Sequence, residues 1–322
     1  MIPIRDTIPS RHYPVVNVLI IVVNIFIFLV EMSQGEALNR FMYTYGLVPA
    51  RYSMLQFAAH LTLFQQIFPL ISFMFLHGSF WHLAGNMWFL YIFGDNVEDR
   101  LGHLRYLLFY LLCGLAAGIA HVFFNLDSTM STIGASGAIA GVMGAYFILY
   151  PKARIVTLIP IIFIPYFVEL PAAIFLGIWL FIQFISAVLT SVNAGGIAWW
   201  AHIGGFIFGA LFLKIFLMFP GPGIPRILSD ATVRKSTPRL HMARPVPQTA
   251  EPDLFDVISI TPEEAARGAK KLISIPFGYQ KKNIVVRIPP GIRDGTKLRL
   301  EGMGKKTNGD QRGDLYLQVS VR

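Results

Sequence analysis

The residues of this chain that could carry chemistry are polar groups set into long apolar segments. Ser136 lies between two glycines in "TIGASGAIAGVMGAY", where turn residues give way to an apolar run. Two other apolar segments begin in a comparable way, with His82 and Asn86 in "FWHLAGNMW" and His202 in "WWAHIGGFIFG". A hydroxyl, an imidazole and hydrogen-bond donors are the minimum set for acyl transfer, because they supply a nucleophile, a general base and stabilisation of an oxyanion.

These groups lie in a chain whose composition is that of a membrane protein. Of its 322 residues, 54% are hydrophobic and 14% are charged, and the mean hydropathy is +0.56. A membrane span needs about 20 mostly apolar residues. Six segments reach or approach that length, near residues 14–31, 79–97, 103–124, 135–150, 171–191 and 201–218. We therefore expect an all-α polytopic membrane protein with a six-helix membrane domain over residues 1–219, and not an ordinary soluble globular protein.

Basic residues between the spans predict the orientation of the chain, because Lys and Arg of short loops collect on the cytoplasmic side. They precede the first span and occupy the second-to-third and fourth-to-fifth loops as Arg5, Arg11, Arg100, Arg105, Lys152 and Arg154. Both termini are therefore expected to be cytoplasmic. The first span has no small-residue cleavage site, so we interpret it as a retained anchor. A seventh span in the partly apolar first loop, residues 32–78, is the alternative topology, and it would place the termini on opposite sides.

The predicted orientation brings the polar side chains to one depth. The second, fourth and sixth spans all run from outside to inside, and each begins with one of these groups. His82 and Asn86 are about one turn apart and share a face of their helix. The fourth span has only about 16 residues, or roughly 24 Å against a hydrocarbon core of about 30 Å. Ser136 is therefore expected near the outer face but below the surface, beside a water-filled cavity.

Glycines next to these residues predict close packing of the fourth and sixth helices. The glycines concerned are Gly137, Gly141 and Gly144 beside Ser136, and Gly205 and Gly209 on the face of His202. Small residues let helix backbones approach closely in lipid. We expect this contact to hold the imidazole against the hydroxyl, while Gly134 and Gly137 shape the backbone around Ser136.

Less specific interpretations of these residues stay open. Serine and glycine in membrane helices usually serve packing, and a histidine near a helix end usually anchors that end or fills a hydrogen bond. The location of four such groups at one depth favours catalysis over both. A zinc protease lacks its H-E-x-x-H motif, and Asp95, Asp99 and Asp127 lie at a helix end or in a loop and form no aspartyl pair. The single cysteine, Cys113, permits no intrachain disulfide and no thiol metal cluster. We expect no metal and no cofactor.

Three motifs in the second, fourth and sixth spans resemble those of the rhomboid intramembrane serine proteases. They are H-x-x-x-N at residues 82–86, G-x-S-G at 134–137 and A-H-x-x-G at 201–205. The resemblance covers about residues 10–218 and implies a six-helix rhomboid bundle. It also implies a catalytic dyad without an acid, in which Ser136 is the nucleophile and His202 the general base and acid. His82, Asn86 and the Ser136 N–H would form the oxyanion hole.

Two positions depart from patterns found in some members of that family. Some members stack an aromatic residue, four positions after the nucleophile, on the catalytic histidine, and that position here is Ala140. What holds the ring of His202 is therefore an open question. The Trp-Arg pair of some first loops is also missing, and "GLVPARY" with Arg51 occupies that region. The family's E-x-x-x-G corresponds to Glu98 and Gly102, which we interpret as structural.

The chain beyond residue 219 is a separate, basic region. Residues 220–253 are rich in Pro and polar residues and indicate a flexible linker. Residues 254–322 show short alternating runs broken by Pro and Gly turns, which predict a small soluble β domain. This part resembles the C-terminal peptide-binding domain of DnaJ-type co-chaperones through "ITPEEAARGAKKLISI", "IPPGIRDGTKLRLEGMG" and "GDLYLQVSV". The J-domain's His-Pro-Asp and the CxxCxGxG repeats are missing from the sequence, so the resemblance implies peptide docking or self-association; a solvated appendage is the alternative.

These observations predict an intramembrane serine endopeptidase that cleaves transmembrane segments of other membrane proteins near the outer face. The expected partners are those substrates, the lipid bilayer, and a cytoplasmic peptide or protein bound by the C-terminal domain; nucleic acid is not expected. The expected location is a prokaryotic plasma membrane. A catalytically silent rhomboid-like protein that binds membrane helices in quality control is the alternative. A transporter, which would need broken helices and charged midplane residues, is a third class.

Overall fold

The computed structural model describes most of the chain and divides it into two compact units. The described residues are 1–161, 164–190, 197–219, 232, 240–242, 253–277, 280–305 and 312–321. One unit spans Met1–Arg234 and the other Lys235–Arg322.

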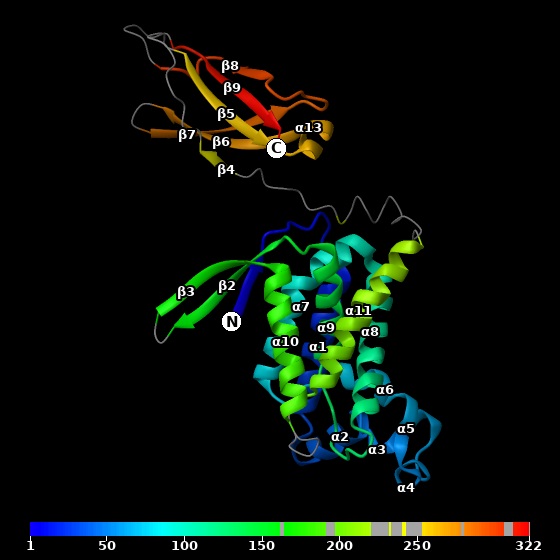
Figure 1. Ribbon diagram of the computed structural model, residues 1–322. Helices are drawn as coiled ribbons and strands as arrows, with labels where there is room; N and C mark the ends of the chain where they lie inside the picture. The colour runs from blue at the N-terminus through cyan, green and yellow to red at the C-terminus, as the bar shows by residue number, and fades with distance from the viewer. Residues whose placement is uncertain are drawn as a thin grey trace. The chain divides into compact units, whose positions relative to one another are not determined.

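The first unit is built on long helices that fall on the six apolar segments predicted from the sequence. They are α1 (Val15–Met32), α7 (Phe80–Leu101), α8 (His103–Phe124), α9 (Ser136–Leu149), α10 (Ala172–Leu189) and α11 (Trp199–Met218). Helix α9 lies inside the bundle, where it contacts α7, α8, α10 and α11 (Figure 1). Every residue of α9 from Gly137 to Tyr146 is buried, which explains why this helix is apolar on all sides.

By length and composition, fewer helices qualify as membrane spans than the six predicted from the sequence. Among the described residues, four helices are long and apolar enough to cross a membrane: α1, α8, α10 and α11. A fifth candidate joins residues Leu63–Phe75 to α7, and the two parts are bent by 77°. Helix α9 has only 14 residues. The helical bundle is therefore confirmed, whereas the count of six spans stays a prediction.

The first loop is a series of short helices and not a simple connection. Its elements are η1 (Gly35–Ala37), α2 (Leu38–Tyr45), α3 (Ala50–Ser53), α4 (Leu55–Ala58), α5 (Leu63–Ile67), α6 (Pro69–Ser72) and η2 (Phe73–Phe75). Leu47 and Thr132 exchange backbone hydrogen bonds of 2.9 and 2.8 Å, and Gly134 N donates to Phe73 O at 2.9 Å. The loop is thereby fastened to the segment that leads into α9. The seventh-span alternative falls on residues 63–75, the bent partner of α7.

The membrane unit also contains a three-stranded antiparallel sheet, which the sequence did not predict. Its strands are β1 (Ile2–Asp6), β2 (Arg154–Ile161) and β3 (Ile164–Pro171), in the order β1-β2-β3. In Figure 1 the β2–β3 hairpin extends away from the helices. Its residues are apolar on both faces, so the segment lacks the alternation that identifies a half-buried strand.

Glu98 and Gly102 have the structural role expected of them. The buried Glu98 carboxylate accepts hydrogen bonds from Val16 N at 2.9 Å and Asn17 N at 2.7 Å, at the N-terminus of α1, where unpaired backbone N–H groups attract an anion. His103 Nδ1 lies 2.5 Å from the same carboxylate. Gly102 has φ +81° between α7 and α8, a conformation that favours glycine. Together they join α1 to the α7–α8 turn.

The N-terminal strand is also fastened to the bundle by a buried acid. Asp6 Oδ2 accepts hydrogen bonds from the Tyr146 hydroxyl at 2.6 Å and from Asn96 Nδ2 at 2.8 Å. Burial raises the pKa of Asp6, and the hydrogen bond from Tyr146 partly offsets this effect. The strand therefore reaches the end of α9 that is opposite to Ser136.

The second unit consists mostly of strands, as predicted. One sheet has the order β4-β6-β7, formed by Leu240–Met242, Ala269–Phe277 and Gln280–Ile288; the other has the order β5-β9-β8, formed by Leu254–Ile260, Leu315–Val321 and Lys297–Leu300. A short helix, α13 (Pro262–Arg267), begins at a capping box between Thr261 and Glu264. Strand β4 lies within the predicted linker, and most of the remaining linker lies outside the described residues.

Glycines at the α9–α11 crossing bring the two backbones into contact. A β-carbon added at Gly205 would collide with the carbonyl of Gly137, and one at Gly209 with the carbonyl of Gly141. In the reverse direction, a β-carbon at Gly144 would collide with the carbonyl of Phe206. The predicted close contact between these helices is therefore present, and it depends on having no side chain at these positions.

We expect Gly209→Val to destabilise the membrane unit, because the added side chain meets backbone that cannot rotate away. Overpacking of this kind costs about 1–3 kcal/mol, to be measured as the free energy of unfolding in mixed micelles. Gly177→Val on α10 is the matched control, because a β-carbon at Gly177 has no neighbour within 4 Å among the described residues. Equal stability of the two variants would contradict the close-contact explanation.

Candidate active site

The bundle brings Ser136 and His202 into hydrogen-bond contact. Ser136 is the first residue of α9, and His202 lies in the first turn of α11. Their Oγ and Nε2 atoms are 2.7 Å apart, and His202 is 8% exposed. This is the distance at which an imidazole can take the proton of a hydroxyl. The pair is separated by 66 positions in the chain, so it exists only because α9 and α11 meet.

Gly134 shapes the approach to Ser136. Its φ of +130° is a conformation that residues with side chains rarely adopt, and a β-carbon there would lie 2.8 Å from His82 Nε2. The same point is 3.7 Å from Ser136 Oγ. Gly134 therefore lets the backbone pass between the imidazole of His82 and the serine hydroxyl.

His82 lies beside this region in the first turn of α7, and Asn86 follows one turn later on the same face of the helix. The Ser79 hydroxyl accepts a hydrogen bond from His82 N at 3.2 Å and so caps the helix. Asn86 is buried, at 8% exposure. Its Nδ2 has no hydrogen-bond partner among the described atoms. A buried amide donor without a partner is costly, and it is available to an anion that forms nearby.

The other ring nitrogen of His202 contacts a residue that the sequence analysis missed. Gln183 Oε1 lies 2.7 Å from His202 Nδ1. The indole of Trp179, also on α10, lies 5.8 Å from the imidazole between ring centroids, and Trp199 approaches at 6.2 Å with its ring perpendicular. These contacts hold the ring that Ala140 leaves without an aromatic neighbour. A glutamine inside the apolar run "LFIQFISAVL" was the available signal, because polar residues in spans are functional candidates.

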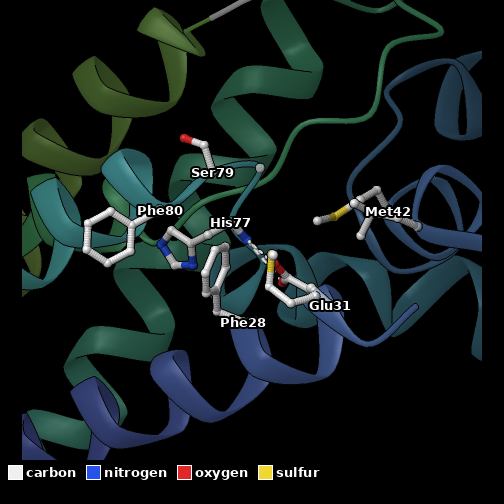
Figure 2. A pocket seen from close by; sticks show the side chains of 9 residues that line it. Phe28, Glu31, Met42, His77, Ser79 and Phe80 are labelled. Carbon is white, nitrogen blue, oxygen red and sulfur yellow. Dashed lines mark hydrogen bonds between the residues drawn. The ribbon is translucent and has the colours of Figure 1, made fainter. Parts of the chain in front are cut away.

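A pocket behind His82 contains a second group that the sequence analysis missed. It has a volume of about 280 Å³ and is lined mainly by apolar side chains from α1, α2 and the start of α7. Figure 2 shows Glu31 beneath His77 in this pocket. The Glu31 carboxylate oxygens accept from His77 N at 3.1 and 3.2 Å, and the rings of His77 and His82 are 5.1 Å apart, nearly perpendicular. Glu31 thus supports the loop that precedes α7.

The described residues contain no group of three or more His, Cys, Asp or Glu side chains arranged to hold a metal ion. His77 and His82 are adjacent, but their neighbour Glu31 contacts the backbone of His77. The chemistry open to this arrangement is that of its serine, imidazole and amide groups.

Comparison with known families identifies both units. The family described as Rhomboid domain matches residues 64–219. Residues 64–219 of the membrane unit are a rhomboid domain. The family described as DnaJ C terminal domain matches residues 257–322, within the mostly-β unit. Both resemblances expected from the sequence are thereby confirmed.

Curated relatives of the rhomboid domain come from yeast, plants and mammals. Rhomboid protein 1, mitochondrial, of Saccharomyces cerevisiae is 27% identical over 147 residues, which cover 43% of this chain and 38% of the relative. RHOMBOID-like protein 6, mitochondrial, of Arabidopsis thaliana is 30% identical over 164 residues, covering 48% and 45%. Presenilin-associated rhomboid-like protein, mitochondrial, of Homo sapiens is 29% identical over 153 residues, covering 44% and 36%. The chain thus spans less than half the length of these relatives.

The location expected from the sequence is wrong. These relatives of the rhomboid domain are named as mitochondrial proteins, which contradicts a prokaryotic plasma membrane with cytoplasmic termini. Hydropathy and loop charge describe how a chain meets a bilayer and do not identify the membrane. A multi-pass membrane location is supported by the rhomboid domain and its apolar helices.

Proposed function

We propose that this chain is an intramembrane serine endopeptidase that hydrolyses peptide bonds in or near transmembrane segments of other membrane proteins. The observation that carries the proposal is the 2.7 Å contact between Ser136 Oγ and His202 Nε2 at the end of a bundle with rhomboid identity. A serine used only for packing would not require a histidine on its hydroxyl.

The proposed reaction is acyl transfer in two steps. Ser136 Oγ bonds to the carbonyl carbon of the scissile peptide, its proton passes to His202 Nε2, and the carbonyl π electrons move onto the oxygen. When this intermediate collapses, the C–N bond breaks and the leaving amine takes the proton from Nε2. Water then attacks the acyl ester, again giving a proton to Nε2, and the ester bond breaks. The proton returns to Ser136 Oγ as the new carboxyl terminus leaves.

The oxyanion formed in each step needs donors on the side of Ser136 that faces α7. Asn86 Nδ2 is the strongest candidate, because it is buried and has no partner among the described atoms. His82 and the backbone N–H of Ser136 complete the proposed set, and the uncapped start of α9 favours negative charge. Gly134 lets His82 lie close to Ser136, because a side chain at this position would collide with the imidazole of His82. Gly137, Gly141, Gly205 and Gly209 serve the proposed set indirectly by closing the α9–α11 contact.

The proposed substrate class comes from the family of the membrane unit. The rhomboid resemblance implies that membrane segments of other proteins enter laterally from the bilayer and are cleaved where a helix is weakened by small residues. The DnaJ C terminal domain suggests an additional protein-binding role. We propose that residues 254–322 bind a peptide segment of a substrate or partner, and that residues 220–253 link the two domains.

A catalytically silent rhomboid-like protein remains the second candidate. It would bind membrane helices without cleaving them. Nothing at the Ser136–His202 contact favours this interpretation, and covalent labelling of Ser136 separates the two candidates.

We expect a fluorophosphonate probe to label the full-length protein in detergent covalently at Ser136. Ser136→Ala removes the nucleophile and His202→Ala removes the base, so labelling is lost in the first and falls more than roughly 10³-fold in the second. Ser186→Ala, on α10, is the control for loss of a hydroxyl and should label like wild type. If wild type reacts no faster than Ser136→Ala, the silent alternative is correct.

We expect Asn86→Ala to lower kcat on a transmembrane substrate by about 10²-fold with little change in KM, because an oxyanion donor acts in the transition state. Asn39→Ala, at an exposed position of α2, removes the same side chain elsewhere and should leave both constants unchanged. A change confined to KM would show that Asn86 binds substrate and does not stabilise the oxyanion.

Removal of the residues after Arg234 tests the role of the C-terminal domain. We expect the shortened chain to keep fluorophosphonate labelling, because the Ser136–His202 contact lies in the other unit. Its cleavage rate should fall only for substrates that carry a peptide segment recognised by that domain. Equal rates for the full and the shortened chain on every membrane substrate would contradict a recruiting role.

A further inference from the structure

Gln183 lies on the opposite side of the His202 ring from Ser136. Its Oε1 is 2.7 Å from Nδ1 of His202, while Nε2 is 2.7 Å from Ser136 Oγ. Gln183 is 6% exposed. The three side chains form a continuous line from α10 through α11 to α9.

The direction of these hydrogen bonds decides whether His202 can act as a base. A neutral imidazole carries one proton, so one ring nitrogen donates and the other accepts. Nε2 can take the Ser136 proton only when the ring proton is on Nδ1. An acceptor at Nδ1 favours that tautomer, and the Gln183 carbonyl oxygen is an acceptor. The opposite amide orientation would present NH₂ to Nδ1 and move the ring proton to Nε2, where it blocks the reaction.

We propose that Gln183 is a positioning residue that holds His202 in the tautomer required of the base. This inference rests on the proposed peptidase function. The amide occupies the place that a carboxylate has in Ser-His-Asp enzymes, where the third residue fixes the tautomer and orientation of the histidine. Gln183 also supports the imidazole ring, which has no aromatic neighbour at the position of Ala140.

Gln183 lies on α10, so its contact with His202 depends on how that helix packs. Helix α10 is apolar and presents most of its side chains to the surroundings, and its buried residues are Ala172, Phe175, Leu176, Gln183 and Ala187. Trp179 of the same helix contacts both His202 and Phe206 of α11. The tautomer of the base is therefore tied to the docking of α10 against α11.

Simple filling of space is the alternative role for Gln183. A buried glutamine can serve packing, and its loss would then lower stability without changing proton transfer. Two substitutions separate the roles. Gln183→Met keeps the volume and removes the acceptor. Gln183→Glu keeps both shape and acceptor and adds a charge that favours the imidazolium form of His202.

The test uses the full-length protein, a transmembrane substrate and the fluorophosphonate probe across a range of pH. We expect Gln183→Met to lower kcat about 10- to 100-fold at nearly constant KM; this is less than the roughly 10⁴-fold loss caused by enforcing the wrong tautomer in Ser-His-Asp enzymes. We expect Gln183→Glu to label well at alkaline pH, with the pH of half-maximal labelling raised by about one unit or more. Ser186→Ala, on the same helix, is the control and should change neither quantity.

Three results would bear on the inference in distinct ways. A wild-type kcat in Gln183→Met, or an unchanged pH profile in Gln183→Glu, overturns the positioning role while the peptidase function stands. Should Gln183→Met fail to fold, the pH profile of Gln183→Glu decides alone. If wild-type protein does not label above Ser136→Ala, it is the proposed function that fails, and the role of Gln183 fails with it.

Discussion

The close contact between α9 and α11 is the constraint on which the rest of the site depends. Ser136 and His202 lie on these two helices, and their side chains meet at 2.7 Å where the helices cross closely. In lipid no hydrophobic force draws helices together, so close contact comes from packing of small residues. The glycines on both helices supply it, and a single β-carbon at Gly205 or Gly209 would meet backbone of the partner helix.

Two acids of the membrane unit are hydrogen-bonded to other parts of that unit. Glu98 accepts from the N-terminus of α1, and Asp6 accepts from Tyr146 and Asn96. These acids are paired, as expected of polar groups withdrawn from water. Other buried polar atoms have no partner among the described atoms, and they are Asn86 Nδ2, Asn24 Oδ1, both ring nitrogens of His77, His103 Nε2 and the Tyr110 hydroxyl. Asn86 lies one turn after His82 on the same face of α7, and His82 lies beside Gly134 at the entry to α9, so the Asn86 amide is the donor that we propose for the oxyanion.

The features of this protein that depend on local sequence were predictable, whereas contacts between distant segments were not. The positions of the long helices were predictable because length and hydropathy are local properties, and the mostly-β second unit was predictable from its turns. The β2–β3 hairpin was missed because both of its faces are apolar. Glu31 and Gln183 were missed as site residues although each is polar within an apolar run, since nothing local shows which polar side chain faces which. The count of six spans is not established, because α9 is short and α7 follows a bent segment.

What the sequence determined by itself is the set of groups and their helices: Ser136 among glycines, His202 and Asn86 at helix starts, and a family resemblance carried by their spacing. The tertiary structure decided which of these groups meet. It placed Nε2 of His202 against the Ser136 hydroxyl and Nδ1, at the opposite edge of the ring, against the carbonyl oxygen of Gln183. The reason is physical: the orientation of a ring is set by contacts on both of its sides, and one of those contacts comes from α10, whose approach no local pattern encodes.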